Sequence, residues 1–491
     1  MITVKGLECL KRAEVLIYDR LIDDCLLDAA PADAEKIYVG KGHGCHAREQ
    51  KDINELLVAK AKEGKTVVRL KGGDPFVLGR GGEEAEALAQ NGIPFEVVPG
   101  VSSAYAVPAY AGIPVTDRRL ASSFMVLTGH EDAEKTASTI HWDKVSVGSD
   151  TLIILMGMSN LASIADELVK NGRTASTPVA VISQGTDPQQ RTLVGTLANI
   201  ARRAKEEGFE APAVIVIGEV VQLREHLRWF DNRPLFGKRI LVTRPEERTG
   251  KLSQLLRERG ATPVEMPVIK ILPPERRAEL DQAIRSLKSY GWIIFTSVNA
   301  VEMFLGRLDA LKRDARWLGD IKIGAIGPAT AKSLEMHGVR PDYMPDVYTS
   351  HGFLTGLDKK AIAGQKVLLP RADIAGNELT DGLIALGAQV YQVTAYRTVA
   401  VKDADSPGKR MLLKGEIGVI TFTSASTVNN LVAVLGRDWE AIKKAKLACI
   451  GPNTAAALAQ KGLKPDIVAR EHTIQGLAEA IERYFEAEVA R

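Results

Sequence analysis

The second half of the sequence repeats itself, and this repeat limits the possible folds more than any other feature. Landmarks of the first copy return in the same order roughly 125 residues later. Ile294-Phe-Thr-Ser-Val-Asn299 returns as Thr421-Phe-Thr-Ser-Ala-Ser426. Ala325-Ile-Gly-Pro-Ala-Thr330 returns as Cys449-Ile-Gly-Pro-Asn-Thr454. Solenoids have a much shorter period, so this one indicates two domains of the same α/β fold.

Short apolar strands alternate with amphipathic helices along the whole chain. The first half contains apolar runs of strand length at 124–127, 151–155, 179–182 and 214–217. Such alternation is typical of α/β layers. The 491 residues are enough for roughly three or four domains of this kind.

Two segments predict domain boundaries. The loop-like stretch around residues 114–120 divides the first half into domains 1–117 and 118–229. Residues 230–237 are polar and contain a proline, and a fresh strand follows at 239–243. We therefore expect residues 230–237 to form a linker.

The charge balance argues against two classes of partner. The formal net charge is only +3, so no global field would hold nucleic acid or an anionic membrane. The sequence also contains no apolar run near the ~20 residues that span a bilayer. An anionic substrate would have to be held by local arginines, lysines and helix N-termini.

The cysteines indicate a reducing compartment. The four are scattered, without a CxxC pair, which argues against a disulfide framework. The N-terminus has charges where a signal peptide needs its apolar core, so we expect a cytoplasmic protein. His43, Cys45 and His46 form a close group of soft metal ligands, but no second group supplies a fourth, and no metal site is predicted.

A glycine-rich run at residues 69–84 predicts a ligand-binding loop. The apolar strand ending at Leu70 is followed by Gly72-Gly73-Asp74-Pro75 and by three more glycines before an acidic helix start at Glu83. Without Cβ atoms, backbone amides there can approach a ligand closely. The spacing is neither the dinucleotide fingerprint nor a Walker loop, and a simple tight turn is the alternative.

Residues 1 to about 231 resemble the uroporphyrinogen-III C-methyltransferases. The resemblance rests on this run and on Tyr18-Asp-Arg-Leu21, Val39-Gly-Lys-Gly-His43 and Val98-Pro-Gly-Val-Ser102. It implies a two-domain tetrapyrrole methylase fold and S-adenosylmethionine as cofactor. The residues that it implies for the cofactor are Gly72, Gly73, Asp74, Val77, Ser102, Ser103, Met156, Gly185 and Ala213.

The resemblance also implies the catalytic groups of this half. Asp19 matches the family's proton acceptor, Lys41 matches its proton donor, and Arg48 would clamp a substrate carboxylate. Methylation of a pyrrole carbon builds positive charge, which a carboxylate can stabilise or relieve by deprotonation. The alternatives are a helix-capping Asp19 and a solvated Lys41.

The N-terminus departs from the family pattern. The family begins with a strand and a Gly-Pro-Gly-Asp-Pro loop, whereas this sequence starts inside the following segment, at Met1-Ile-Thr-Val-Lys-Gly6. We expect the first strand and one wall of the cofactor pocket to be missing, through a start codon placed too late or a real loss. A chain that is only a synthase, with an inactive methyltransferase half, is the alternative.

The repeated half predicts four helix starts suited to an anion. Ser297 and Ser424 stand at N-cap positions after apolar strands, and Thr330 and Thr454 follow Gly-Pro helix starts. Four such sites at matched positions favour a cleft for a polyanionic substrate. Simple helix capping is the alternative at each site.

Residues 236–487 resemble uroporphyrinogen-III synthase. The resemblance implies two α/β domains, of the doubled flavodoxin-like kind, with a two-stranded hinge: residues 238–272 plus 399–491, and residues 273–398. It also implies cyclisation of hydroxymethylbilane without a cofactor, with Tyr396 assisting departure of the hydroxyl. The alternatives are a hinge tyrosine that only packs and a non-catalytic two-lobed binding module.

Together the two resemblances predict an enzyme of sirohaem and cobalamin synthesis that catalyses consecutive steps. The second half would form uroporphyrinogen III, and the first would methylate it twice, to precorrin-2. The expected partners are tetrapyrroles and a second copy of the chain, bound through the methyltransferase half.

Overall fold

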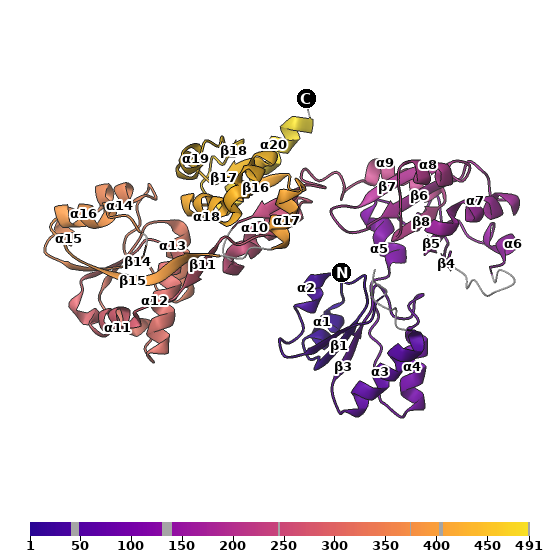
Figure 1. Cartoon of the computed structure of the whole chain (residues 1–491), viewed down its shortest axis with the longest axis horizontal. Coiled ribbons are helices and arrows are strands. Elements are labelled where there is room, and N and C mark those ends of the chain that lie inside the picture. The colour runs from indigo at the N-terminus through magenta and orange to yellow at the C-terminus, as the bar shows by residue number, and fades with distance from the viewer. Residues whose placement is uncertain (41–48, 130–139, 244–245, 374, 402–405, 490–491) are drawn as a thin grey trace. The chain divides into compact units, whose positions relative to one another are not determined.

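A computed structural model describes residues 1–40, 49–129, 140–243, 246–373, 375–401 and 406–489. The chain divides into two compact units, Met1–Gly237 and Lys238–Arg491 (Figure 1). None of the helices in these residues is both long enough and apolar enough to cross a membrane.

The first unit begins with a small parallel sheet of order β2-β1-β3. Its strands are β1 (Val15–Tyr18), β2 (Glu35–Tyr38) and β3 (Val67–Leu70). The helices of this part are α1 (Val4–Leu10), α2 (Asp24–Leu27), α3 (Gln50–Lys62) and α4 (Gly81–Gln90). The central strand β1 is the most buried, and its Val15 and Ile17 share a core with Leu57 of α3.

β3 is one of the two edge strands of this sheet. In the described residues, β3 pairs with β1 on one side and with no strand on the other, and all four of its residues stay half-buried. Residues 94–98 follow α4 without strand pairing, and Phe95 there is 48% exposed. The absence of a first strand from this domain stays a prediction.

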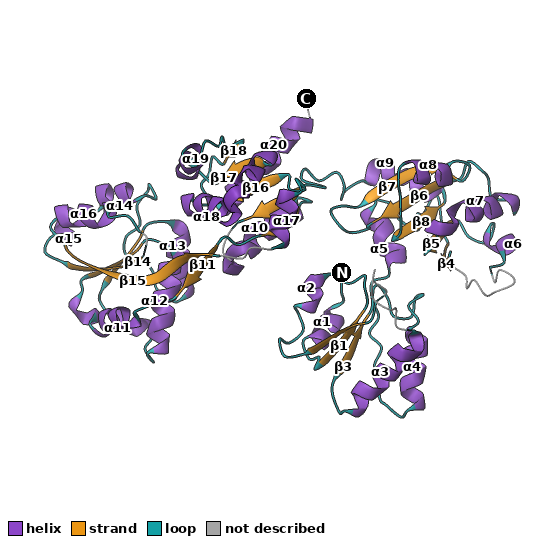
Figure 2. Ribbon diagram, in the orientation of Figure 1, coloured by secondary structure: helices purple, strands orange, loops and turns teal. Residues whose placement is uncertain are grey.

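A second, mixed sheet of order β4-β5-β8-β6-β7 follows in the same unit. Its strands are β4 (Phe124–Thr128), β5 (Thr151–Leu155), β6 (Pro178–Ser183), β7 (Arg191–Thr196) and β8 (Ala213–Ile217). The accompanying helices are α5 (Ser103–Tyr110), α6 (Trp142–Val145), α7 (Leu161–Lys170), α8 (Ile200–Glu206) and α9 (Arg224–Leu227). α7 and α8 cover one face of the sheet and α5 the other (Figure 2).

α5 packs with this second sheet although the predicted boundary lies at residue 117. Ala104 and Val107 share a core with Ile153 and Val216. The helix is apolar almost all round, which suits burial against a sheet face. It therefore runs directly from the loops of the first domain to the core of the second.

Residues 230–237 pack against the first unit. Phe230 is 4% exposed and Leu235 is fully buried. The Phe230 ring lies 4.7 Å from the Tyr110 ring of α5, and the Arg233 guanidinium lies 4.8 Å from the Trp229 ring. The polar residues of this segment suggested a linker, but its apolar residues anchor it to α5.

The described residues of the second unit form two five-stranded sheets. The first has the order β10-β9-β16-β17-β18 and the second the order β11-β15-β14-β12-β13. The strands of the first are β9 (Arg239–Val242), β10 (Thr262–Glu265), β16 (Val419–Phe422), β17 (Lys446–Cys449) and β18 (Ile467–Val468). Those of the second are β11 (Ile269–Leu272), β12 (Trp292–Phe295), β13 (Lys322–Ala325), β14 (Lys366–Ala372) and β15 (Gln389–Ala400).

Helices cover the sheets of the second unit. They are α10 (Glu246–Glu258), α11 (Arg277–Arg285), α12 (Val298–Ala310), α13 (Pro328–Met336), α14 (Ser350–Gly356), α15 (Lys359–Ile362), α16 (Glu378–Ala385), α17 (Pro407–Leu413), α18 (Ala425–Leu435), α19 (Pro452–Ala459) and α20 (Ile474–Val489). In the second sheet, α11, α12 and α13 cover one face, and α14 and α16 cover the other. Helices on both faces explain why strands such as β12 are buried along their whole length.

The sequence repeat corresponds to a repeated strand order. The series β10-β9-β16-β17 of one sheet matches β15-β14-β12-β13 of the other, strand by strand with the repeated landmarks. The predicted doubled α/β fold is thus confirmed. A two-stranded antiparallel ladder, from Ile269↔Ala400 to Leu272↔Arg397, runs from one core to the other, because Ile269 belongs to the first and Ile271 to the second.

Candidate cofactor and substrate sites

The glycine-rich loop after β3 is tied to the loop before α5. One oxygen of the Asp74 carboxylate accepts a hydrogen bond from Phe76 N (2.8 Å), and the other accepts one from Gly100 N (2.8 Å). A Cβ atom added at Gly100 would clash with the Gly73 carbonyl oxygen. The two loops can therefore approach this closely only because residue 100 is a glycine.

These contacts place four of the predicted cofactor residues together. Gly73 lies against the start of α5, where a Cβ added to it would be 3.7 Å from Ser103 N. Ser102 is the N-cap of α5, and its Oγ accepts a hydrogen bond from Ala104 N (3.2 Å). Both carboxylate oxygens of Asp74 accept hydrogen bonds from backbone N–H groups, so this side chain stabilises the shape of the loop.

Three more predicted residues meet at one edge of the second sheet. In the antiparallel register Leu155 opposes Val214, and Ser183 opposes Ala213. Met156 and Gly185, which follow β5 and β6, therefore lie near the start of β8 at Ala213. A Cβ added at Gly185 would clash with Val107 of α5, so α5 connects this edge with the loops described above.

Backbone strain gathers around the same turns. Among the described residues, six non-glycine residues have a positive φ, and five of them follow β3, β5 or β6. These five are Leu78 (53°), Arg80 (57°), Met156 (57°), Gln184 (50°) and Thr186 (72°). Such conformations cost about 1–3 kcal/mol each and cluster at functional sites. Val77 lies in the first of these turns and is 39% exposed.

Asp19 belongs to a network of charged side chains. Its Oδ1 lies 2.6 Å from Arg69 Nη2, while Arg69 Nε lies 3.1 Å from Glu84 Oε1. Lys71 Nζ lies 2.7 Å from the same Glu84 oxygen, and Glu84 is 5% exposed. The Asp19 carboxylate is therefore paired with an arginine.

Sequence reasoning missed the roles of Arg69 and Glu84 in this network. Arg69 and Lys71 are two residues apart on an extended segment, so their side chains point to the same side. That spacing was a usable signal, but the partner Glu84 became apparent only once α4 was placed beside β3.

Two of the predicted catalytic and substrate residues, Lys41 and Arg48, lie outside the described residues. The same holds for His43, Cys45 and His46. Within the parts of the chain that the structure describes, no group of three or more histidine, cysteine and acidic side chains could hold a metal ion.

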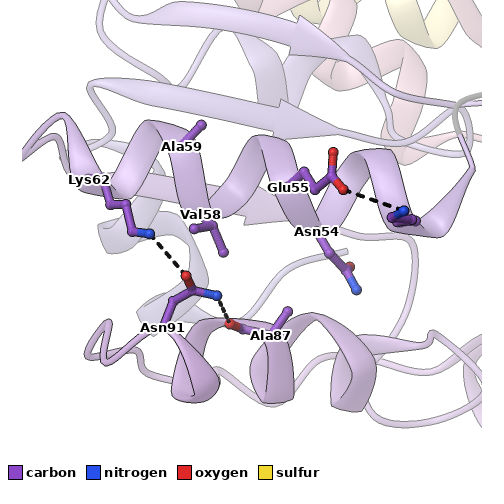
Figure 3. A pocket seen from close by; sticks show the side chains of 8 residues that line it. Asn54, Glu55, Val58, Ala59, Lys62, Ala87 and Asn91 are labelled. Atoms are coloured by element: carbon purple, nitrogen blue, oxygen red, sulfur yellow. Dashed lines mark hydrogen bonds and ion pairs between the residues drawn. The ribbon is translucent and has the colours of Figure 1, made fainter.

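A groove of about 380 Å³ lies between α3 and α4 (Figure 3). Lys62 Nζ donates a hydrogen bond across it to Asn91 Oδ1 (2.9 Å), and Asn91 in turn bonds the Ala87 carbonyl (3.0 Å). The groove is lined by none of the predicted site residues. Its rim includes the exposed side chains of Lys51 and Glu55, which lie 4.0 Å apart.

In the second unit the predicted serines cap helices. Ser297 Oγ accepts a hydrogen bond from Ala300 N (3.2 Å) at the start of α12. Ser424 caps α18 in a capping box with Thr427. In each sheet the capped helix and the neighbouring glycine-proline helix start follow adjacent parallel strands, β12 with β13 and β16 with β17. The paired helix starts of each half therefore stand at one sheet edge.

The threonines of those neighbouring helices are nearly buried. Thr330 of α13 is 5% exposed, and Thr454 of α19 is 3% exposed. Both helices begin with proline immediately after a glycine N-cap, as predicted. Side chains this enclosed restrict any ligand contact of the two threonines to a small area.

Tyr396 meets Ser297, and the two were predicted separately. Tyr396 Oη lies 3.1 Å from Ser297 Oγ, although the residues are far apart in the chain. The Tyr396 ring is 8% exposed and packs in the core beneath α12. The tyrosine therefore packs at the hinge strand and also presents its hydroxyl at a helix start.

Comparisons with known proteins agree with this division. Residues 1–201 match the family of tetrapyrrole (corrin/porphyrin) methylases, and residues 250–479 match uroporphyrinogen-III synthase HemD. A porphyrin biosynthesis protein HemD of Ruminiclostridium josui is 39% identical over 481 residues, covering 98% of this chain and 95% of that protein.

Other relatives match the first unit above all. An S-adenosyl-L-methionine-dependent uroporphyrinogen III methyltransferase of Methanosarcina barkeri is 54% identical over 46% of this chain and 89% of its own length. A uroporphyrinogen-III C-methyltransferase of Bacillus subtilis is 40% identical over 70% of this chain and 71% of its own length. From these matches and the two folds, the chain belongs to the family of porphyrin biosynthesis proteins that join a tetrapyrrole methylase to a uroporphyrinogen-III synthase.

Proposed function

We propose that the protein catalyses two consecutive steps of tetrapyrrole synthesis. The second unit closes hydroxymethylbilane to uroporphyrinogen III, and the first methylates that product twice, to precorrin-2, with S-adenosylmethionine. The observation that carries the proposal is the continuous similarity to one porphyrin biosynthesis protein across both units. This product is a precursor of sirohaem and cobalamin.

The first unit offers groups that fit S-adenosylmethionine. The Ser103 N–H, at the first position of α5, has no hydrogen-bond partner among the described residues and suits a carboxylate. The loops at Gly73 and Gly100 approach each other closely, and the turns at Met156 and Gln184 have strained conformations, as is common at functional sites. The residues proposed to hold it are Gly72, Gly73, Asp74, Val77, Ser102, Ser103, Met156, Gly185 and Ala213, with Asp74 acting through loop shape.

The charged network of the first unit supports a role for Asp19 in methyl transfer. When bound, S-adenosylmethionine would supply the methyl group, which it carries on its positively charged sulfur. As the pyrrole carbon gains this methyl group, Asp19 stabilises the positive ring or accepts its proton. Arg69 holds the carboxylate in place through their ion pair. Lys41 and Arg48 are proposed to donate a proton and to bind a substrate carboxylate.

The second unit is proposed to expel the terminal hydroxyl of hydroxymethylbilane as water. The carbon–oxygen bond breaks with its electron pair on oxygen, and the Tyr396 phenol gives its proton to that oxygen. The methylene carbon is left cationic, stabilised by the pyrrole nitrogen, and Tyr396 is left as a phenolate. The backbone N–H groups at the helix starts marked by Ser297, Thr330, Ser424 and Thr454 are proposed to bind substrate carboxylates.

Separate assays of the two activities on the full chain test the proposal. Hydroxymethylbilane alone should give the type III isomer, and uroporphyrinogen III with S-adenosylmethionine should gain two methyl groups. Type III formation without methylation would leave a synthase only. Formation of the symmetric type I isomer alone would show that the second unit is a binding module.

We further propose that the protein works in the cytoplasm and forms a homodimer through the first unit. The scattered cysteines support the first statement. Light scattering of the full chain and of a chain lacking the second unit tests the second: a monomer in both cases would exclude the dimer.

A further inference from the structure

The cap of α12 differs from its counterpart in the other half of the repeat. Ser297 and Ser424 occupy the same position in the two halves, and each caps its helix through Oγ. Ser297 Oγ also contacts Tyr396 Oη at 3.1 Å. Ser424 Oγ instead contacts Ser426 Oγ at 2.8 Å. One serine of the pair is thus linked to a phenol and the other to a second serine.

The capping bond leaves Ser297 its own hydroxyl proton, so Ser297 can be the donor in its contact with Tyr396. Its Oγ already accepts the Ala300 N–H (3.2 Å), while its own hydroxyl proton is free to be donated. When Ser297 donates its proton to Tyr396 Oη, the phenolic proton of Tyr396 is not bound by Ser297 and can be given to the substrate. A chain of hydrogen bonds then runs from the α12 backbone through Ser297 to Tyr396, and each bond polarises the next.

The start of α12 also suits the charge that forms on Tyr396. α12 runs for 13 residues, and the positive end of its dipole lies at the cap. A phenolate hydrogen-bonded to Ser297 would be stabilised by that end of the helix. The helix end stabilises the phenolate more than the neutral phenol. An interaction that becomes stronger as the proton leaves lowers the barrier of the step.

We propose that Ser297 is a positioning residue that holds Tyr396 Oη and directs the phenolic proton toward the departing hydroxyl. The proposal rests on the proposed synthase function. In the balanced step, the Tyr396 O–H bond breaks, a new O–H bond forms on the leaving oxygen, and water departs as the carbon–oxygen bond breaks. Ser297 loses no proton in this step and only donates its hydrogen bond.

Steady-state kinetics of the full chain with hydroxymethylbilane test the proposal. Tyr396→Phe should lower kcat by about 100-fold or more, as expected for loss of a general acid. Ser297→Ala should lower kcat by about five- to tenfold with little change in KM, as expected for loss of one hydrogen bond. Ser297→Thr keeps the hydroxyl and should restore most of that loss.

A double-substitution cycle separates positioning from substrate binding. If Ser297 acts through Tyr396, Ser297→Ala should cost nothing further in the Tyr396→Phe background. Ser424→Ala is the matched change, since it also removes a helix cap but no contact with a tyrosine, and any effect of it should persist in that background. A Ser297→Ala effect confined to KM, or one fully retained beside Tyr396→Phe, would overturn the positioning role.

The same set of variants tells this proposal apart from the one beneath it. Unchanged kcat in Tyr396→Phe would remove the tyrosine from the reaction, and the role of Ser297 with it. Loss of kcat in Tyr396→Phe with none in Ser297→Ala would leave the synthase function standing and reject only the positioning role. If the two single variants lose kcat equally, a double variant with the same kcat as either of them supports the positioning role. A double variant with a lower kcat rejects it.

Discussion

Arg69 is shared by two carboxylates, and this sharing sets the environment of Asp19. Glu84 is almost fully buried and forms ion pairs with both Arg69 and Lys71. Asp19 forms an ion pair with another nitrogen of the Arg69 guanidinium. Two positive and two negative charges are thereby balanced in one small volume. Removing one member leaves a buried charge without compensation, which is far more costly than losing a surface pair.

Glu84→Gln should therefore lower the free energy of unfolding of the first unit by about 3–5 kcal/mol. Glu83→Gln is the matched control, because Glu83 pairs with Arg80 at the surface, with both side chains at least half exposed. That change should cost less than about 1 kcal/mol. Urea unfolding followed by circular dichroism measures both. Equal losses would mean that Glu84 is not part of a buried network.

Cys449 should be inert toward thiol reagents in the folded protein. Burial raises the pKa of its thiol to about 12, so below that pH it stays protonated, and the thiolate is the reactive form. Labelling at pH 8 with iodoacetamide, followed by peptide mass spectrometry, should leave Cys449 unmodified until denaturant is added. Rapid labelling without denaturant would contradict its burial.

The paired loops before α4 and α5 show how two elements build one site. Asp74 joins them by accepting the Gly100 N–H, while its other oxygen accepts the Phe76 N–H of its own loop, and the lack of a Cβ at Gly100 permits their contact. Each loop restrains the other, because one supplies the Asp74 carboxylate and the other supplies the Gly100 N–H that binds to it. The site therefore depends on the spacing between the loops as much as on the identity of their side chains.

Gly100→Ala should weaken S-adenosylmethionine binding by about tenfold or more, since a displacement of about 1 Å in a binding geometry is costly. Gly82→Ala is the control, because a Cβ there meets nothing within 4 Å, and alanine favours the helix α4. Titration calorimetry measures both affinities. Similar affinities for the two variants would show that the loop contact does not shape the cofactor site.

The repeat made the second unit predictable from its sequence. Matched landmarks around Ser297 and Ser424 located the strands and helix caps, because those features depend on local sequence. The contact between Ser297 and Tyr396 depends on how α12 packs on β15, which no local pattern encodes. The pairing of Asp19 with Arg69 escaped prediction for the same reason.

The strained turns of the first unit were also beyond prediction. Met156, Gln184 and Thr186 adopt positive φ without being glycine, so their conformation is imposed by the surrounding sheet. The glycine-rich run, by contrast, revealed its turn through composition alone. Sequence patterns therefore located the glycine-rich loop, while the structure revealed the strained turns that follow β5 and β6.

The molecule consists of two units, and the segment 229–237 belongs to the first. Phe230 makes edge-to-face contacts with Tyr110 and Phe236, and Arg224 pairs with Asp231 just before the second unit begins. This aromatic segment ends the methylase unit with a packed surface. The two units should consequently unfold in separable steps.

Phe230→Ala should destabilise only the first unit, by about 3–5 kcal/mol, as for other buried aromatic residues. Asn232→Ala, at an exposed position of the same segment, should have little effect. Calorimetry of the full chain should show one transition moved to lower temperature and the other unchanged. A shift of both transitions would show that the units unfold together.

The full chain, given hydroxymethylbilane and S-adenosylmethionine with a ¹³C-labelled methyl group, tests the two-step account most directly. Mass spectrometry and isomer separation of the product should reveal a type III tetrapyrrole that carries two labelled methyl groups. An unlabelled product would contradict the methylase step. A type I product without label would contradict both steps.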